Sequence, residues 1–116
     1  MKSKKYSNRK NMSGKVSGIY IVFHTKYNRP LLKGPIQKRT KDIIHDVMDD
    51  LECGVEQIMV YPNRVHLQFV YPPRLSISKI MNIVKGKSSC LLRKEFPELV
   101  RQCPKALWAP KYGMIY

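Results

Sequence analysis

The chain has 116 residues, enough for one domain with a modest hydrophobic core. Its 22 Lys and Arg residues outnumber its 8 Asp and Glu residues, and the resulting net charge of +14 favours a polyanionic partner, nucleic acid before an acidic membrane surface. The sequence has no apolar run near the ~18 residues of a membrane span and no signal-peptide pattern, which argues against a membrane protein. Its three widely spaced cysteines match no zinc motif and predict reduced thiols in a cytoplasmic protein.

Residues 1–15 form a distinct basic segment. They contain six Lys and Arg residues, no acid and almost no apolar side chain, so we expect a disordered arm that either contacts phosphates nonspecifically or serves as a solubilising terminus. The folded domain is expected over residues 16–116. With 16 basic and 8 acidic residues this part still carries +8, so the basic character is not confined to the arm.

The first predicted elements are a strand and a helix. Residues 17–25 are apolar on both alternating faces, which predicts a central strand and makes His24 a satisfied core histidine. A helix is expected over 38–53, with Thr40 as a possible N-cap and Gly54 as its stop. Its buried stripe would consist of Ile44, Val47, Met48 and Leu51.

Two strands follow, over 55–61 and 64–71, joined by a tight turn at Pro62-Asn63. Successive side chains of a strand point to opposite faces. The second strand should therefore have one polar face and one core face, with Arg64, His66 and Gln68 on the first and Val65, Leu67 and Phe69 on the second.

A second helix is expected over 76–94, with Ser76 as its cap and Gly86 either dividing it or allowing a close backbone approach. A last strand is expected within 107–116. The order strand, helix, strand, strand, helix, strand predicts an α+β fold of the ferredoxin-like (split βαβ) class, an antiparallel sheet with two helices on one face.

Several stretches from about residue 16 onward resemble the single-tyrosine HUH transposases of the insertion-sequence 200-like family. The order and spacing of these stretches carry the resemblance more than any one of them. They are Ile21 to Pro30, Gly54 to Ile58, Pro62-Asn63-Arg64-Val65-His66-Leu67, Pro72 to Ile80 with Val84 to Ser89, Phe96-Pro97, and Leu107 to Pro110.

The resemblance implies metal-assisted chemistry on single-stranded DNA. In the family, two histidines one residue apart hold a divalent metal (Mg or Mn), and a tyrosine hydroxyl attacks phosphorus. Here Arg64 stands at the first histidine position, and a guanidinium has no lone pair for a metal, so His66 is left as a weak ligand or as none. The sequence also ends at Tyr116, before the family's tyrosine-bearing helix. Impaired cleavage is therefore expected.

Tyr112 and Tyr116 are candidate substitute nucleophiles. Both lie in the predicted last strand, where a period of two places them on one face, and either could approach the polar face that carries His66. The ordinary alternative is that both rings pack a sheet or dimer surface.

Nucleic-acid contacts are expected where the resemblance and the local chemistry coincide. A guanidinium can hold a phosphate bidentately, and an aromatic ring between cations is suited to stack an unpaired base. The alternative for each lysine is a solvated side chain, and Trp108 is expected in the core. The candidate residues are Lys26, Tyr27 and Arg29 in a strand-exit loop, Arg64 and Gln68 beside His66, and Lys85, Lys87 and Ser88 in the second helix.

Three functions remain open at this point. The first is a transposase of this family that binds single-stranded or hairpin DNA at element ends and has lost much of its cleavage, and the second is a working enzyme. The third is an RNA-binding module or a generic basic nucleic-acid-binding regulator, although residues 65–71 lack the glycine-flanked aromatics of RNA-recognition sheets. A homodimer is expected from the resemblance and from the open sheet edges.

Overall fold

The computed structural model describes residues 16–115, so the predicted arm at 1–15 and Tyr116 lie outside the described residues. In chain order the elements are β1 (Val16–Thr25), the 3-10 turn η1 (Lys26–Asn28), α2 (Pro35–Asp50), β2 (Gly54–Tyr61), β3 (Arg64–Tyr71), α3 (Ile77–Glu95), α4 (Pro97–Gln102) and β4 (Trp108–Ile115).

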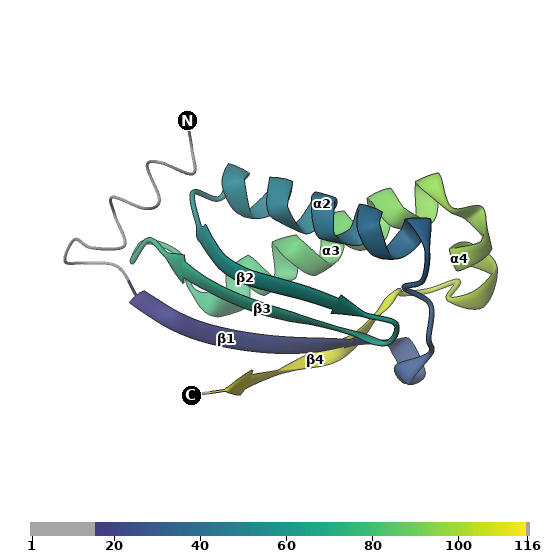
Figure 1. Ribbon diagram of the computed structural model, residues 1–116, viewed down its shortest axis with the longest axis horizontal. Coiled ribbons are helices and arrows are strands. Elements are labelled where there is room, and N and C mark those ends of the chain that lie inside the picture. The colour runs from purple at the N-terminus through teal and green to yellow at the C-terminus, as the bar shows by residue number, and fades with distance from the viewer. Residues whose placement is uncertain (1–15, 116) are drawn as a thin grey trace.

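The four strands form one antiparallel sheet in the order β2-β3-β1-β4. Helices α2 and α3 both lie on the same face of this sheet, and α4 lies at one end of it (Figure 1). This is the predicted α+β, ferredoxin-like arrangement, and β1 is central as expected. The β2–β3 turn, η1 and α4 are at the same end of the molecule (Figure 1).

The two faces of the sheet differ in burial because side chains alternate along each strand. The helix-covered face of β3 contributes Val65, Leu67 and Phe69, all fully buried, as the alternation predicts. The other face of β1 was expected to be equally buried, but His24 is only partly buried there. His24 is therefore not a core histidine, and its strand is central without being covered on both faces.

The hydrophobic core fills the space between the sheet and the two long helices. Phe23 of β1 packs edge-to-face on Trp108 of β4, with ring centroids 4.8 Å apart, so Trp108 is a core residue as expected. The buried residues of the helices lie at helical spacing, which confirms the stripe predicted for the first helix except at its end, where Leu51 is partly buried. They include Ile43, Ile44, Val47 and Met48 of α2 and Ile80, Met81, Val84 and Leu92 of α3.

The predicted boundaries of the first helix were wrong. Helix α2 begins at Pro35, whose ring fixes φ in a helical value and whose missing N–H would be unpaired in the first turn anyway. Thr40 is therefore in the helix interior, where its buried hydroxyl donates to the carbonyl of Ile36 at 2.7 Å. At the other end Glu52, with φ of 61°, takes the left-handed conformation expected of a terminating glycine, and Gly54 begins β2.

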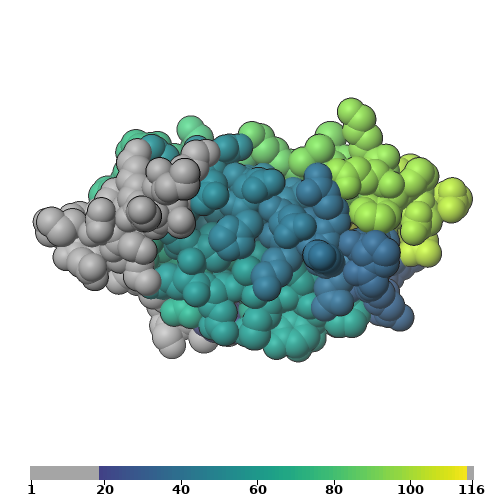
Figure 2. All heavy atoms as spheres, turned by 45° about the horizontal axis from the view of Figure 1, so that its top comes forward, coloured from purple at the N-terminus to yellow at the C-terminus, as the bar shows by residue number. Residues whose placement is uncertain are grey.

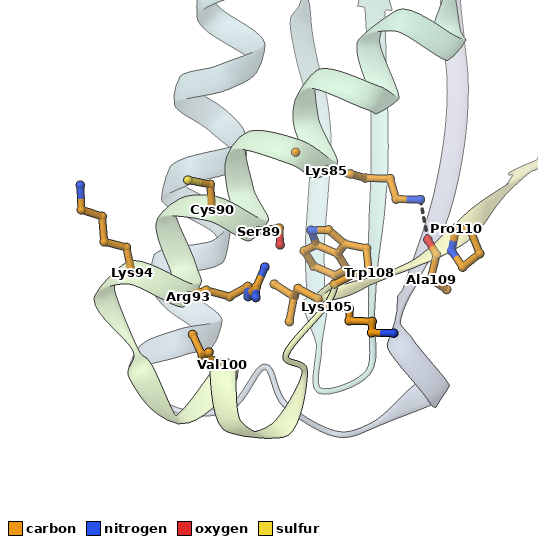
Figure 3. Close-up of a pocket in the computed structure, with 13 residues that line it drawn as sticks. Lys85, Ser89, Cys90, Arg93, Lys94, Val100, Lys105, Trp108, Ala109 and Pro110 are labelled. Carbon is orange, nitrogen blue, oxygen red and sulfur yellow. Dashed lines mark hydrogen bonds between the residues drawn. The ribbon is translucent and has the colours of Figure 1, made fainter.

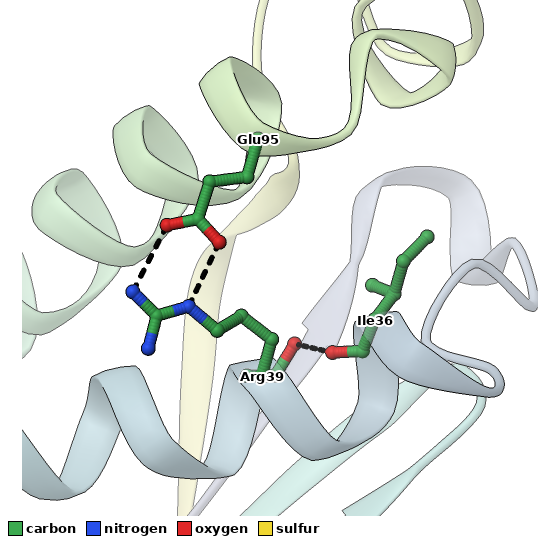
Figure 4. A network of polar contacts seen from close by, with 4 residues as sticks. Ile36, Arg39 and Glu95 are labelled. Carbon is green, nitrogen blue, oxygen red and sulfur yellow. Dashed lines mark hydrogen bonds and ion pairs between the residues drawn. The ribbon is translucent and has the colours of Figure 1, made fainter.

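Helix α3 begins as predicted, because the side chain of Ser76 accepts from the backbone N–H of Lys79 at 3.0 Å. Gly86 neither divides the helix nor admits a close neighbour, since nothing lies within 4 Å of a Cβ built there. Near its end, Glu95 accepts two hydrogen bonds from Arg39 of α2, at 2.8 and 2.9 Å (Figure 4). This exposed pair raises the pKa of Arg39 and lowers that of Glu95. Among the described residues, no helix is long and apolar enough to cross a membrane.

Candidate nucleic-acid interface

The sheet face away from the helices carries the polar side chains predicted for DNA contact, and we call it the polar face. It consists of Tyr20, Val22, His24, Met59, Tyr61, Arg64, His66 and Gln68, which are all partly buried. Strand register brings them together: Arg64 lies opposite His24 of β1 and Tyr61 of β2, and His66 lies opposite Val22 and Met59. Because β3 is between these strands, its polar side chains are in the middle of the face.

Arg64 and His66 are directly hydrogen-bonded to each other. The Nε–H of Arg64 donates to Nε2 of His66 at 3.0 Å. A neutral imidazole carries a single hydrogen, so that hydrogen is on Nδ1, which lies 2.8 Å from the hydroxyl of Tyr20 and donates to it. Both ring nitrogens of His66 are therefore engaged.

The surroundings of His66 keep it neutral. Burial lowers its pKa, and the positive charges of Arg64 and, to a lesser degree, His24 lower it further. Two aromatic rings flank the imidazole edge-to-face, Tyr61 at 5.0 Å and Tyr20 at 5.7 Å between centroids. The site is thus an uncharged imidazole held between a guanidinium and two phenols.

Arg64 is held in place from three sides. Besides His66, its NH1 donates to Oδ1 of Asn63 at 3.0 Å, and its guanidinium carbon lies 4.3 Å from the centroid of the Tyr61 ring. Among residues 16–115, its NH2 has no hydrogen-bond partner. A guanidinium fixed in this way keeps donors available for an oxyanion at little entropic cost.

The residues of this site do not fit a divalent metal. The lone pair of His66 that would bind a metal accepts from Arg64, and a fixed cation ~4 Å from a divalent ion would oppose binding by ~8 kcal/mol at an effective dielectric of 20. No cluster of three or more His, Cys, Asp or Glu suited to a metal occurs among the described residues.

The predicted strand-exit loop, Lys26–Arg29, presents an aromatic ring between two cations. Tyr27 is 75% exposed, and both the Lys26 ammonium and the Arg29 guanidinium lie 5.5 Å from its ring centroid. Tyr27 and Asn28 have φ of 57°, a left-handed conformation that is uncommon for a bulky residue. The strained backbone turns the ring outward instead of burying it, which suits a stacking surface.

This loop is fixed against the end of the sheet. The N–H of Thr25 donates to the carbonyl of Asn63 at 3.0 Å, and that of Lys26 donates to the carbonyl of Leu107 at 2.8 Å. Arg29 also donates to the backbone carbonyl of Gln102 in α4. The loop is therefore next to the β2–β3 turn, directly after which Arg64 begins β3.

The structure separates Tyr112 from His66. Tyr112 lies opposite Phe23 in the β1–β4 register, on the helix-covered face, and packs against the core. The expectation that it could approach the polar face was wrong, because the register places Gly113 there, opposite Val22. Tyr116 lies outside the described residues.

Two of the residues expected to contact DNA in the second helix have structural roles. Ser88 is fully buried, donates to the carbonyl of Val84 at 2.6 Å and accepts from Nε1 of Trp108 at 2.9 Å, so it cannot face DNA. Lys85 is half-buried and donates to the carbonyl of Ala109 at 2.5 Å, and burial lowers its pKa. Lys87 is exposed and remains accessible.

Sequence reasoning missed Tyr20, Tyr61 and Asn63 as members of the site. Strand parity would have placed Tyr20 on the same face as His24, but the register that sets it against His66 is a tertiary property. Sequence reasoning also overlooked the uneven positions of the acidic residues along the chain. Six of the 8 acidic residues lie within 42–56, in α2, in the turn after it and at the start of β2, whereas the Lys26–Arg29 loop has none.

Comparison with known proteins identifies the family of this chain. A profile of the family described as "Transposase IS200 like" matches residues 15–116. The chain belongs to the IS200-like transposase family. Transposases for insertion sequence element IS200 from Salmonella typhimurium (strain LT2) and Salmonella typhi are each 28% identical over 80 residues, which is 69% of this chain. That stretch is 53% of each relative, so the chain spans about half the length of the curated IS200 transposases it matches.

Solved structures share the fold. A Deinococcus radiodurans R1 protein described as a candidate transposase superposes with a TM-score of 0.83 over 91% of this chain and 82% of its own, at 24% identity. A REP-associated tyrosine transposase, solved bound to a REP hairpin, gives a TM-score of 0.56 over 86% of this chain and 56% of its own, at 16% identity. At these identities the two structures support the fold of this chain alone.

Proposed function

We propose that this IS200-like transposase chain binds single-stranded or hairpin DNA through the polar face and the Lys26–Arg29 loop, without a metal and with impaired strand cleavage. The observation that carries the proposal is the hydrogen bond from Arg64 to His66, which replaces a potential metal ligand by a fixed cation. Hairpin DNA is the ligand class of one structural neighbour, the REP-associated transposase.

Arg64 is suited to a phosphate of the DNA backbone. Its fork geometry matches two phosphate oxygens, and His66 and Asn63 hold it without neutralising its charge. The neutral state of His66 matters here because a protonated imidazole carries a hydrogen on both ring nitrogens and could not accept the bond from Arg64. Arg64 thereby positions the phosphate, but the proposed site holds no metal to polarise it.

The neighbouring loop supplies the second half of the interface. An unpaired base stacks on the exposed ring of Tyr27, and Lys26 and Arg29 neutralise the flanking phosphates. Gln68 lies further along the same polar face and can hydrogen-bond a base edge. Stacking is tolerant of sequence, so this loop contributes affinity for unpaired DNA more than choice of sequence.

We also propose that the chain forms a homodimer. Strands β2 and β4 are at the two edges of the sheet, and each leaves backbone groups that another strand can pair. Mass determination by light scattering over a concentration series tests this, with a dimer mass expected. A monomer mass at every concentration contradicts it.

The DNA-binding proposal is tested by fluorescence anisotropy with a hairpin oligonucleotide in the presence and absence of EDTA. We expect Arg64→Ala to weaken binding about tenfold or more, since a charge-assisted bond contributes ~1.5–3 kcal/mol, and EDTA to change nothing. Lys79→Ala, an exposed lysine at the start of α3, is the matched control.

Three results would contradict the proposal. Arg64→Ala and Lys79→Ala could weaken binding equally, which would show that the chain binds DNA through its net positive charge and not through the polar face. EDTA could abolish DNA binding by the wild-type chain, which would show that binding requires a metal. RNA of the same sequence could compete better than the DNA hairpin, which would favour an RNA-binding module.

A further inference from the structure

A second basic site lies on the helix side of β4, away from the polar face. It is a hollow of about 560 Å³ between the second half of α3, α4 and the segment leading into β4 (Figure 3). We call it the α4 hollow. Its floor is apolar, formed by Trp108, Leu107 and the 40% exposed Val100.

The charged residues that line the α4 hollow are all positive. Its lining includes four cations, Lys85, Arg93, Lys94 and Lys105, and no Asp or Glu. The acid next in sequence, Glu95, is turned toward Arg39 of α2 and bonded to it (Figure 4). In the space-filling view α4 protrudes at one end of the molecule, next to the η1–α2 segment (Figure 2).

Arg93 has an unmet donor in this hollow. Its NH2 donates to the carbonyl of Pro104 at 2.5 Å, but its Nε is buried and has no hydrogen-bond partner. Its guanidinium is directed toward Ser89 and Trp108, while Lys94 and Lys105 extend on opposite sides (Figure 3). A buried donor without a partner is unusual in folded proteins, so Arg93 is not fully satisfied by the protein. Arg93 also lines the hollow, where the accessible N–H groups of its guanidinium can donate to an anion oxygen.

A further hollow connects this region to the proposed DNA-binding loop. It measures about 450 Å³ and is lined by Lys26, Tyr27 and Arg29 together with residues of the 102–106 segment. It shares Lys105 and Ala106 with the α4 hollow. Cations therefore line a path from Tyr27 to Arg93 that no described carboxylate interrupts in either lining.

We propose that DNA bound at the Lys26–Arg29 loop continues across residues 104–106 into the α4 hollow, where Arg93 binds a backbone phosphate. Lys94 and Lys105 neutralise the phosphates on either side, and the apolar floor contacts sugar and base. This inference rests on the proposed function and extends its footprint from the polar face to the helix side of β4.

The test is the dependence of affinity on oligonucleotide length, measured by anisotropy with a series of single-stranded DNAs. Each of three variants removes one cation from the proposed path. They are Arg93→Gln, Lys94→Glu and Lys105→Glu. Lys94 and Lys105 are exposed, and their side chains make no hydrogen bond within residues 16–115, so these two variants keep the test valid if Arg93→Gln destabilises the chain. Lys79→Glu, about 20 Å from Arg93 along α3, is the control for net charge.

We expect the wild-type affinity to rise with length and the variants to lose about tenfold on long DNA while keeping wild-type affinity for the shortest DNA that binds. Each lost contact should also reduce the logarithmic salt slope by about 0.7. An equal loss in Lys79→Glu, or an equal loss on short and long DNA, overturns the inference. Failure of the proposed function gives a different result from failure of this inference. If the proposed function were wrong, Arg64→Ala would bind the shortest DNA with wild-type affinity.

Discussion

Arg64 donates from its Nε to Nε2 of His66 at 3.0 Å, so two side chains at i and i+2 on one strand satisfy each other. The same spacing with two imidazoles would direct two lone pairs to one point outside the sheet. With arginine instead of histidine at position 64, the site donates hydrogen bonds where two histidines would donate electron pairs to a metal. The strand that holds the two side chains can stay the same.

Arg64→His should create metal binding that the wild-type chain lacks. The substitution supplies a second imidazole and removes both the repelling cation and the bond that occupies Nε2 of His66. Titration with Co²⁺, followed by its visible absorption and by calorimetry, is the measurement. Arg64→Gln is the control, because it removes the charge without adding a ligand. Equal Co²⁺ affinity in wild type and Arg64→His would refute the explanation.

Tyr27→Ala should weaken single-stranded DNA binding by ~1–3 kcal/mol, whereas Tyr27→Phe should retain it, because stacking requires the ring and not the hydroxyl. The side chain is 75% exposed, so neither change should lower the free energy of unfolding by much. Anisotropy and thermal unfolding of both variants separate the two effects. Loss of affinity in Tyr27→Phe would point to a hydroxyl contact instead.

Ser88→Ala should destabilise the fold by ~1–3 kcal/mol and leave DNA affinity unchanged while the chain is folded. The substitution leaves the buried Nε1–H of Trp108 without its acceptor. Ser89→Ala, at the next position and only partly buried, is the control, with little change expected. Denaturant unfolding checks the first claim. A stable Ser88→Ala variant with weakened DNA binding would restore the DNA contact inferred from the sequence.

Folding stability should fall as the pH drops below about 6.5, and His66 should account for part of the loss. The folded pKa of His66 is lowered, so the unfolded chain takes up the proton first, and the folded state loses relative stability until the pH falls through the folded pKa. The difference in unfolding free energy between wild type and His66→Gln should therefore shrink on acidification. A difference independent of pH would contradict the assigned pKa direction.

Incubation with Mn²⁺ and a hairpin oligonucleotide should leave the intact mass of the denatured protein unchanged. Tyr112 is on the opposite face of the sheet from His66, and the imidazole has no free lone pair for a metal. An oligonucleotide adduct that disappears in Tyr112→Phe or in Tyr20→Phe would instead establish a working nucleophile and overturn the proposed impairment.

Much of the fold could be predicted because its determinants are local. Alternation along β3 predicted its two faces, and the Ser76 cap predicted the start of α3. The start of α2 was missed because Thr40 has the chemistry of a cap but serves as a buried hydroxyl, whereas Pro35 was the better signal. The short helix α4 was not predicted at all, since six residues give too little periodicity.

The site was less predictable because it depends on pairing between distant strands. Parity placed Arg64 and His66 together, but only the β1–β3 register adds Tyr20, 46 residues away in sequence. Ser88 was predicted to contact DNA from the resemblance of its segment to the family, but in the structure its hydroxyl accepts from Trp108. Local chemistry therefore identifies candidate groups, while packing decides which of them face outward.

The polar face and the Lys26–Arg29 loop contain cations and no acid, whereas six of the 8 acids lie within 42–56, so charge is placed unevenly over the described residues. In the field of a polyanion, this uneven placement favours approach with η1 and Arg64 first. The unequal placement of charge should therefore act on the rate of productive encounter, which falls with ionic strength, before any individual contact is made.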